Sequence, residues 1–320
     1  MQHITLAGTG SFVPEGKLTN ADLEAMVDTS DEWIMTRTGI SERRIASPEQ
    51  ATSDLAYEAA TAALADAGLA ADALGLIVVG TSTPDHIFPS VACKLQARLG
   101  CGPTTAFDVN AACTGFLSAL QVAEQFLRTG AAEHALVVGA DTMSRIIDYR
   151  DRGTCILFGD GAGAFVLSRS DTPGLFASRT YSDGAHYDKL YVCGGGSRAP
   201  SEGHVPHIKM NGRAIFQLAV RAMVSATEDV LKASGLTLAD VDYLVPHQAN
   251  KRILSAVADA LGVPFERVIN TIREYGNNSA ASVPLAFDLA VKDGRIQRGD
   301  TVALSAFGGG LAWGAALLTY

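Results

Sequence analysis

The sequence lacks cysteine pairs at metal-binding spacing and lacks any long apolar run. Its five cysteines are scattered, at positions 93, 101, 113, 155 and 193. Such an odd, scattered set argues against a zinc site and is typical of reduced thiols in the cytoplasm. No apolar stretch approaches the roughly 20 residues that span a bilayer, and the N-terminus lacks the basic segment and apolar core of a signal peptide. We therefore expect a cytoplasmic protein with no membrane span.

Positive charge is also scarce. The net charge is −9 and the isoelectric point is near 5.2, a balance that argues against nucleic-acid binding. Any anionic partner must therefore be met by a local basic patch. Hydrophobic residues make up 48% of the chain and charged residues 18%, as in a well-buried globular protein. A length of 320 residues suffices for two domains or one large layered unit.

The segment TAFDVNAACTGF, Thr105 to Phe116, places a cysteine where a strand turns into a helix. An apolar strand pattern precedes Cys113, and an amphipathic helical pattern follows it. A helix N-terminus offers free backbone N–H groups and a positive dipole, which would favour the nucleophilic thiolate of Cys113. The alternative is a buried core cysteine, because free cysteine is often buried.

Helical and strand patterns alternate along the chain. The patterns predict strands over residues 3–10, 74–83, 105–113, 134–141 and 158–169, and helices over residues 21–28, 53–67, 89–99 and 116–129. Residues 170–210 contain glycines and several histidines without clear periodicity, and we expect a boundary with surface loops there.

Part of the second half repeats the first. A helix end, a Gly-Leu stop, an acidic spacer and an apolar strand occupy residues 63–79 and recur 167 residues later, at 230–246. The segment 158–167 also resembles 307–318, which carries two extra residues. We predict a duplicated α/β fold, divided into residues 1–170 and 171–320, in which strand ends from both copies meet at one cleft.

Two polar residues of the second half are candidates for that cleft. His247 follows the apolar strand VDYLVP, and Asn277 precedes a helix in YGNNSAASVP. Alone, His247 would be a satisfied surface or core histidine, and Asn277 a helix N-cap. Together with Cys113 they form a reactive set, because a cysteine can accept an acyl group while two N–H donors hold a carbonyl oxygen that becomes an enolate. A Cys–His hydrolase would instead use the histidine as a base.

Two further segments have both a functional and a structural interpretation. The glycine turn FGGGLAWG, residues 307–314, could supply oxyanion-hole amides or could simply be a tight turn. Trp33 lies among Arg37, Arg43 and Arg44, where an adenine could stack on the indole while guanidinium groups hold phosphates. The alternative is a half-buried packing residue with solvated neighbours.

At these residues the chain resembles β-ketoacyl-acyl carrier protein synthase III, the initiating condensing enzyme of type II fatty acid synthesis. The resemblance covers essentially the whole length, through the motifs GTGSFVPE, TNADLE, VDTSDEWI, TRTGI, AACTGF, ILFGDGAGA, LVPHQAN, SAASVP and AFGGG in order. It implies a thiolase-like fold with a five-layered αβαβα core, a homodimer, and no metal or redox cofactor.

The resemblance also implies roles for individual residues. Cys113 would be acylated by a primer acyl-CoA, His247 and Asn277 would promote decarboxylation of malonyl-acyl carrier protein, and the amides of Cys113 and Gly309 would form the oxyanion hole. The CoA contacts would be Trp33, Arg37, Arg152, Gly212 and Asn250. The primer pocket would involve Phe158, Ile208 and Phe307, with Phe88 reaching in from the neighbouring subunit.

An acidic carrier protein needs a basic docking patch, and Arg213, Lys251 and Arg252 are the candidates. Gln217 and Asp259 stand where relatives can carry lysine, so the footprint of docking stays open.

The primer's length and branching stay open as well. Two other functions remain: a related condensing enzyme with another acyl-CoA starter, and a thioester hydrolase on the same scaffold. A non-catalytic homologue would lack the cysteine.

Overall fold

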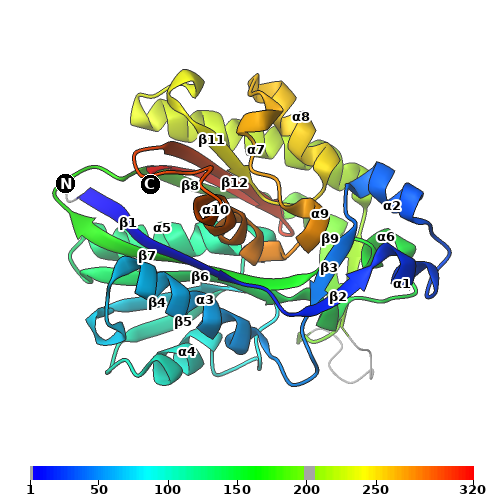
Figure 1. Ribbon diagram of the computed structural model, residues 1–320, viewed down its shortest axis with the longest axis horizontal. Helices are drawn as coiled ribbons and strands as arrows, with labels where there is room; N and C mark the ends of the chain where they lie inside the picture. Colours follow the sequence, from blue (N-terminus) through cyan, green and yellow to red (C-terminus); the bar gives the residue numbers. More distant parts are fainter. Residues whose placement is uncertain (1–2, 198–205) are drawn as a thin grey trace.

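The computed structural model describes residues 3–197 and 206–320, in which the strands form two main sheets (Figure 1). The first sheet has the order β1 (His3–Phe12), β7 (Asp160–Ser170), β6 (His134–Thr142), β4 (Leu76–Gly80) and β5 (Thr105–Val109). The second has the order β11 (Tyr243–Pro246), β12 (Thr301–Gly308), β13 (Ala312–Thr319) and β8 (Leu175–Ser182). The first sheet thus comes from residues 3–170 and the second from residues 175–319; the division into two domains at residue 170 stays a prediction.

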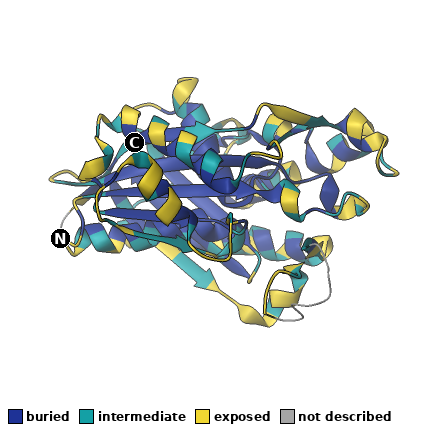
Figure 2. Ribbon diagram, turned by 90° about the horizontal axis from the view of Figure 1, so that it is seen from below, coloured by how far each residue is buried: buried dark blue, intermediate teal, exposed yellow. Residues whose placement is uncertain are grey.

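Helices cover both outer faces and fill the space between the sheets. The outer face of the first sheet carries α3 (Thr52–Ala67) and α4 (Val91–Leu99), and that of the second carries α7 (Gly212–Ser234) and α8 (Lys251–Leu261). Between the sheets lie α5 (Gly115–Arg128) and α10 (Ser282–Lys292). The central strands are buried on both faces, as Figure 2 shows, which explains their continuous apolar sequences. The predicted five-layered arrangement is confirmed.

The remaining helices and strands lie at one end of the molecule, on the right of Figure 1. Two small sheets pair β2 (Gly16–Thr19) with β3 (Glu42–Ile45) and β9 (Leu190–Cys193) with β10 (His207–Met210). The short helices are α1 (Asn20–Glu24), α2 (Asp31–Thr38), α6 (Arg152–Cys155) and α9 (Ile272–Tyr275). Among the described residues, no helix combines the length and apolar character that a membrane span requires.

The predicted repeat corresponds to two matching pieces of structure. Helix α3 ends at Gly68 with φ +62°, and α7 ends at Gly235 with φ +70°. Each glycine is followed by a 3-10 turn and then by a strand, β4 or β11. Both glycines adopt the left-handed conformation that closes a helix, which is the physical basis of the Gly-Leu stop seen in the sequence.

The expectation of loops over residues 170–210 is wrong for most of that segment. Strand β8 forms one edge of the second sheet, and β9 pairs with β10. An edge strand exposes part of its surface, so polar residues such as Arg179 interrupt its apolar pattern and hide it from a periodicity analysis. Residues 198–205, which fall within this expectation, lie outside the described residues.

Strand β1 packs on α3 through two glycines. A Cβ atom at Gly10 would lie 2.3 Å from the Ala59 carbonyl oxygen, and one at Gly8 would lie 2.4 Å from the Ala67 nitrogen. Because these neighbours are backbone atoms of one helix, they cannot move aside individually. The first sheet and its covering helix therefore approach each other only where the strand lacks side chains.

We predict that Gly10→Ala destabilises the protein by about 1–3 kcal/mol or more, since α3 would have to shift away from β1. The measurement is the free energy of unfolding in denaturant, supported by the Tm. Gly102→Ala is the matched control, because no atom lies within 4 Å of a Cβ at that position. Equal stability of the two variants would contradict the close approach of β1 and α3.

Candidate active site

Cys113 lies at the predicted turn between a strand and a helix. Strand β5 ends at Val109, a 3-10 turn covers Ala112–Thr114, and α5 begins at Gly115. The turn requires φ +47° at Ala112, an uncommon conformation for a residue with a side chain. Thr114 Oγ1 donates to the carbonyl of Ala312 at 3.0 Å, which ties the turn to β13 of the second sheet. The cysteine is therefore held by both halves of the chain.

His247 follows β11 directly and is buried. Its backbone N–H donates to the Ser305 carbonyl at 2.7 Å, so the pairing of β11 with β12 extends to this residue. Its side chain is fixed through Nδ1, which lies 2.6 Å from Ser282 Oγ at the start of α10. Burial lowers the pKa of His247 to about 3, so the imidazole is neutral at physiological pH.

The contact with Ser282 also selects a tautomer. The Ser282 hydroxyl accepts a hydrogen bond from the Gln248 N–H at 3.4 Å and has no acceptor other than His247 Nδ1 among the described residues. Donation from this hydroxyl to Nδ1 leaves the ring proton on Nε2. His247 is thereby arranged as a neutral N–H donor.

Asn277 is held by its backbone in an extended bridge with Phe158. Its N–H donates to the Leu157 carbonyl at 2.9 Å, and its carbonyl accepts from the Gly159 N–H at 3.0 Å. The side-chain Oδ1 accepts from the Ser279 N–H at 2.9 Å. This bond fixes the orientation of the carboxamide and leaves its NH2 group without a partner in the described part of the chain.

Cys113, His247 and Asn277 line one narrow cavity of about 120 Å³. Cys113 follows β5, His247 follows β11 and Asn277 follows α9. Strands β5 and β11 each belong to a parallel pair, and the carboxyl ends of such strands are where binding sites form. The rest of the wall is mostly apolar and includes Leu157, Phe158, Leu190, Met210, Gly212, Ile215, Phe216, Ala219, Met223, Ala249, Asn250, Ile253 and Phe307. The three predicted residues therefore line the same cavity, in which His247 and Asn277 supply two neutral N–H donors.

The thiolate expected from the sequence is not the resting form of Cys113. Burial raises the pKa of its thiol to about 12; a contact with Ser279 lowers the pKa, and the nearby Asp141 carboxylate raises it. The sequence analysis considered the helix N-terminus but could not know how completely the sulfur is removed from water. At neutral pH the thiol of Cys113 is therefore protonated before a substrate binds.

Asp141 is a buried residue that the sequence analysis missed. Its carboxylate accepts bonds from Ser82 N–H at 2.8 Å and from Thr83 N–H and Ala280 N–H at 3.1 Å each. Burial raises the pKa of Asp141. An acidic residue at the end of a buried strand was a signal that could have found it.

Within residues 3–197 and 206–320, no three His, Cys, Asp or Glu side chains are grouped as metal ligands would be.

The glycine turn after β12 lies against the cysteine. A Cβ at Gly308 would be 2.7 Å from the Cys113 nitrogen, and one at Gly309 would be 3.6 Å from the Ala112 Cβ. Only glycine allows the backbone at position 308 to come this close to Cys113. The two backbone segments that were predicted to form an oxyanion hole are therefore adjacent.

A larger cavity of about 960 Å³ shares Cys113, Phe158 and Leu190 with the narrow one. Its lining includes Phe158 and Ile208 of the predicted primer pocket, together with Ile87, Met143, Ile146, Leu190 and Val192. Phe307 lines the narrow cavity instead, beside His247 and Asn277. Phe88 lines neither cavity and is 84% exposed.

The predicted adenine site has its components in one place. The guanidinium carbons of Arg37 and Arg152 each lie 4.9 Å from the centroid of the Trp33 ring. Gly212 and Asn250 line the narrow cavity, and Asn250 also caps α8 by accepting from the Arg252 N–H at 2.9 Å.

Arg43 does not belong to this surface cluster. Its side chain is fully buried, and it donates to Asn20 Oδ1 at 2.7 Å and to the Ile156 carbonyl. Burial lowers its pKa to about 10. Arg44 lies over the ring of Tyr275, 5.7 Å from its centroid. Alternation along β3 explains the difference, because neighbouring strand residues point to opposite faces.

The three basic candidates for docking lie on the first turns of two neighbouring helices. Arg213 is on α7, Lys251 and Arg252 are on α8, and all three are exposed. Arg252 also lies over the ring of Phe216, 5.7 Å from its centroid. Helix α2 approaches this patch, since a Cβ at Gly39 would be 2.7 Å from the Lys251 Cβ.

Comparison with known proteins assigns the chain to a family. Residues 107–184 match the family described as 3-oxoacyl-[acyl-carrier-protein] synthase III, and residues 231–320 match its C-terminal family. The chain is 51% identical over 327 residues to a β-ketoacyl-[acyl-carrier-protein] synthase III of Alkalilimnicola ehrlichii, covering 100% of both chains. It is 53% identical to the enzyme of that name from Sphingopyxis alaskensis, covering 98% of both.

Solved structures agree. The 3-oxoacyl-[acyl-carrier-protein] synthase III of Aquifex aeolicus superposes with a TM-score of 0.93 at 45% identity, covering 99% of this chain and 100% of that one. The priming β-ketosynthase of a polyketide pathway superposes with a TM-score of 0.96 at 35% identity, covering 99% and 96%. The chain therefore belongs to the β-ketoacyl-[acyl-carrier-protein] synthase III family, acyltransferases of thiolase-like fold that initiate fatty acid synthesis by a condensation reaction.

Proposed function

We propose that the chain condenses a primer acyl-CoA with malonyl-acyl carrier protein, through an acyl group carried on Cys113. The observation that carries this proposal is that Cys113 shares one narrow cavity with His247 and Asn277, whose side chains are both held as neutral N–H donors. Such donors stabilise a developing enolate oxygen, as decarboxylation of a malonyl thioester requires.

In the first half-reaction, Sγ of Cys113 attacks the thioester carbonyl of the primer. The carbonyl oxygen becomes an oxyanion that the amides of Cys113 and Gly309 bind. The bond to the CoA sulfur then breaks, and the proton lost by the Cys113 thiol ends on CoA. Because the thiol starts protonated, this proton must leave as the new carbon–sulfur bond forms.

In the second half-reaction, His247 Nε2–H and the Asn277 NH2 hold the malonyl thioester oxygen. The bond to the malonyl carboxylate breaks, CO2 leaves, and its electron pair forms the enolate. The enolate carbon attacks the acyl-Cys113 thioester, the carbon–sulfur bond breaks, and 3-oxoacyl-acyl carrier protein forms. The released sulfur takes up one proton.

Substrate binding uses surfaces on either side of this cavity. The CoA adenine would lie between Trp33 and Arg152, with Arg37 near the phosphates, and Gly212 and Asn250 would line the path of the pantetheine arm. Arg213, Lys251 and Arg252 would dock the acidic carrier protein. This placement is supported by the paired arginines over Trp33 and by the exposed positions of the basic residues.

We further propose that the protein acts as a cytoplasmic homodimer in which Phe88 of one subunit closes the primer pocket of the other. Ile87 and Phe88 are 87% and 84% exposed, and Ile87 lines the larger cavity. Adjacent, fully exposed apolar side chains are typical of a contact surface.

The choice between synthase and hydrolase depends on His247. A hydrolase would use a histidine whose free nitrogen accepts a proton, oriented by an acidic or amide group. Here a serine hydroxyl holds Nδ1, which favours an N–H donor at Nε2. Another starter acyl group stays possible, since the similar priming ketosynthase belongs to a polyketide pathway.

We predict that Cys113→Ala abolishes acylation, because Cys113 supplies the one thiol among the described residues that line this cavity. Wild type incubated in turn with acetyl-, isobutyryl- and octanoyl-CoA should gain one acyl mass by intact-protein mass spectrometry, and the variant should gain none. Cys93→Ala, which removes an exposed cysteine, is the control and should acylate normally. An adduct on Cys113→Ala would refute the assignment of the nucleophile.

We predict that His247→Ala and Asn277→Ala each slow decarboxylation of malonyl-acyl carrier protein by about 10²–10³-fold, the effect of losing one oxyanion donor. Release of CO2 is the measurement. His134→Ala is the control, because His134 Nδ1 also binds a serine, Ser168, at 2.8 Å but lies outside both cavities. Decarboxylation unchanged in either site variant would refute its role.

The pH profile gives a separate prediction. Since burial lowers the pKa of His247 to about 3, the imidazole stays neutral as the pH falls from 8 to 5. Decarboxylation in the Cys113→Ala background should therefore show no inflection near pH 6.5, where an ordinary histidine would gain its proton. An inflection there would mean that His247 titrates normally.

We predict that Trp33→Ala raises the KM for acyl-CoA about tenfold, the typical worth of one aromatic ring stacked on a base. The kcat should change little, because Trp33 lies outside the reacting cavity. Tyr57→Ala is the control: Arg98 lies 4.2 Å from the Tyr57 ring centroid, and neither residue lines either cavity. A fall in kcat with unchanged KM would contradict the binding role.

A further inference from the structure

The loop Pro84–Pro89 connects β4 to α4 and has two different sides. On the inner side, Pro84, Asp85, His86 and Ile87 line the larger cavity beside Cys113. On the outer side, the residues from His86 to Pro89 are exposed. The same short segment therefore forms a wall of the cavity and carries the apolar tip, Ile87 and Phe88.

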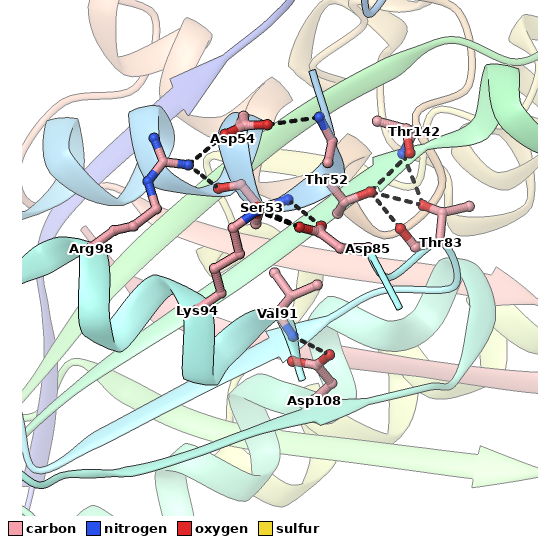
Figure 3. Close-up of polar contacts among 11 residues, drawn as sticks. Thr52, Ser53, Asp54, Thr83, Asp85, Val91, Lys94, Arg98, Asp108 and Thr142 are labelled. Carbon is pink, nitrogen blue, oxygen red and sulfur yellow. Dashed lines mark hydrogen bonds and ion pairs between the residues drawn. The ribbon is translucent and has the colours of Figure 1, made fainter. Parts of the chain in front are cut away.

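Asp85 fixes this loop to the two outer helices of the first sheet (Figure 3). Its carboxylate accepts from Ser53 N–H at 2.9 Å and Ser53 Oγ at 2.7 Å, at the start of α3. Lys94 of α4 donates to the same carboxylate at 2.9 Å. The Asp85 side chain is only 8% exposed, whereas that of Lys94 is 49% exposed, so the carboxylate is largely buried and the ammonium group reaches it from the surface.

Asp85 also provides a hydrogen-bond acceptor at the N-terminus of α3. The residue before α3 is Ala51, whose side chain cannot cap the helix. The Asp85 carboxylate supplies the missing acceptor for the Ser53 N–H and places a negative charge at the positive end of α3. Although burial raises the pKa of Asp85, the bonds from Lys94 and Ser53 lower it below its ordinary value.

The two flanks of the loop are fixed as well. On one side, the Thr83 hydroxyl accepts from the Thr142 N–H at 2.9 Å and donates to Asp141 at 2.8 Å. On the other, the Asp108 carboxylate accepts from the Val91 and Ala92 N–H groups at 2.8 and 2.9 Å, at the start of α4. Asp85 is thus the anchor inside the loop, between two anchored ends (Figure 3).

We propose that Asp85 is a positioning residue that selects the primer, because its bonds to Ser53 and Lys94 fix the wall of the primer cavity formed by the Pro84–Pro89 loop. This inference rests on the proposed function of Cys113 and its larger cavity. A rigid wall excludes acyl chains that are too long, whereas a loosened wall yields to them. In a hydrophobic pocket one methylene group changes specificity by about 10–200-fold, so loss of the anchor should be measurable.

The test is acylation of Cys113 by acetyl-, butanoyl- and octanoyl-CoA under single-turnover conditions, followed by intact-protein mass spectrometry. Asp85→Asn keeps the size of the side chain but places an amide where Lys94 needs a carboxylate. Asp85→Ala removes every bond. We expect the ratio between the best and worst primers to fall by about tenfold in Asp85→Ala and by less in Asp85→Asn, mainly because the disfavoured primer reacts faster.

Asp54→Asn is the matched control. Asp54 lies on the same helix, pairs with Arg98 of α4 at 2.6 Å and accepts from the Ala51 N–H at 2.8 Å, but does not contact the loop (Figure 3). It therefore loses the ion pair with Arg98 without releasing the cavity wall, while the carboxamide oxygen can still accept from the Ala51 N–H. Its primer ratio should equal that of the wild type.

A second measurement does not depend on acyl transfer. Hydrogen exchange of the amides in residues 85–88 should be faster in Asp85→Asn than in wild type or Asp54→Asn. Should the Asp85 variants fail to fold, Lys94→Met removes one arm of the anchor and leaves the helix end intact, with the same expected direction. Primer ratios and exchange rates equal to wild type would overturn the inference; absence of any acyl adduct on wild type would instead refute the proposed function.

Discussion

The active site depends on one buried carboxylate. Asp141 ends the central strand β6 and binds both the turn after β4 and the Ala280 N–H at the start of the last interior helix. One acceptor thus joins the strand ends of the first sheet to the segment that carries Asn277 and Ser279. Removing a group with several buried donors would leave each of them unpaired. This carboxylate therefore fixes the turn after β4 relative to the segment that carries Asn277 and Ser279.

Burial determines the chemistry of the two titratable residues in opposite directions. The same exclusion of water raises the pKa of Cys113 to about 12 and lowers that of His247 to about 3. Both residues are therefore uncharged in the resting protein. A pair of neutral groups suits a site that binds a carbonyl oxygen and develops charge only during reaction, because unpaired charges in such surroundings would be costly.

Much of this arrangement could be predicted from the sequence, because local patterns specify it. The repeat at 63–79 and 230–246 predicted two matching sheets, and the apolar strand before Cys113 predicted its turn. Relationships across the fold could not be predicted. Neither the bond from Ser282 to His247 nor that from Ser279 to Asn277 has a periodic signature. Arg43 looked like its neighbours Arg37 and Arg44, and only the pairing of β3 shows that it points inward.

The duplicated architecture also explains why the two copies cannot carry equivalent chemistry. The position that matches His247 in the first copy, 167 residues earlier, is Gly80. A Cβ there would lie 2.4 Å from the Gly115 carbonyl carbon, because the helix that begins beside Cys113 occupies the space. The two copies of the repeat therefore differ at this point for a steric reason. One half provides the nucleophile, the other provides the imidazole, and a second, symmetry-related centre has no room to form within the same subunit.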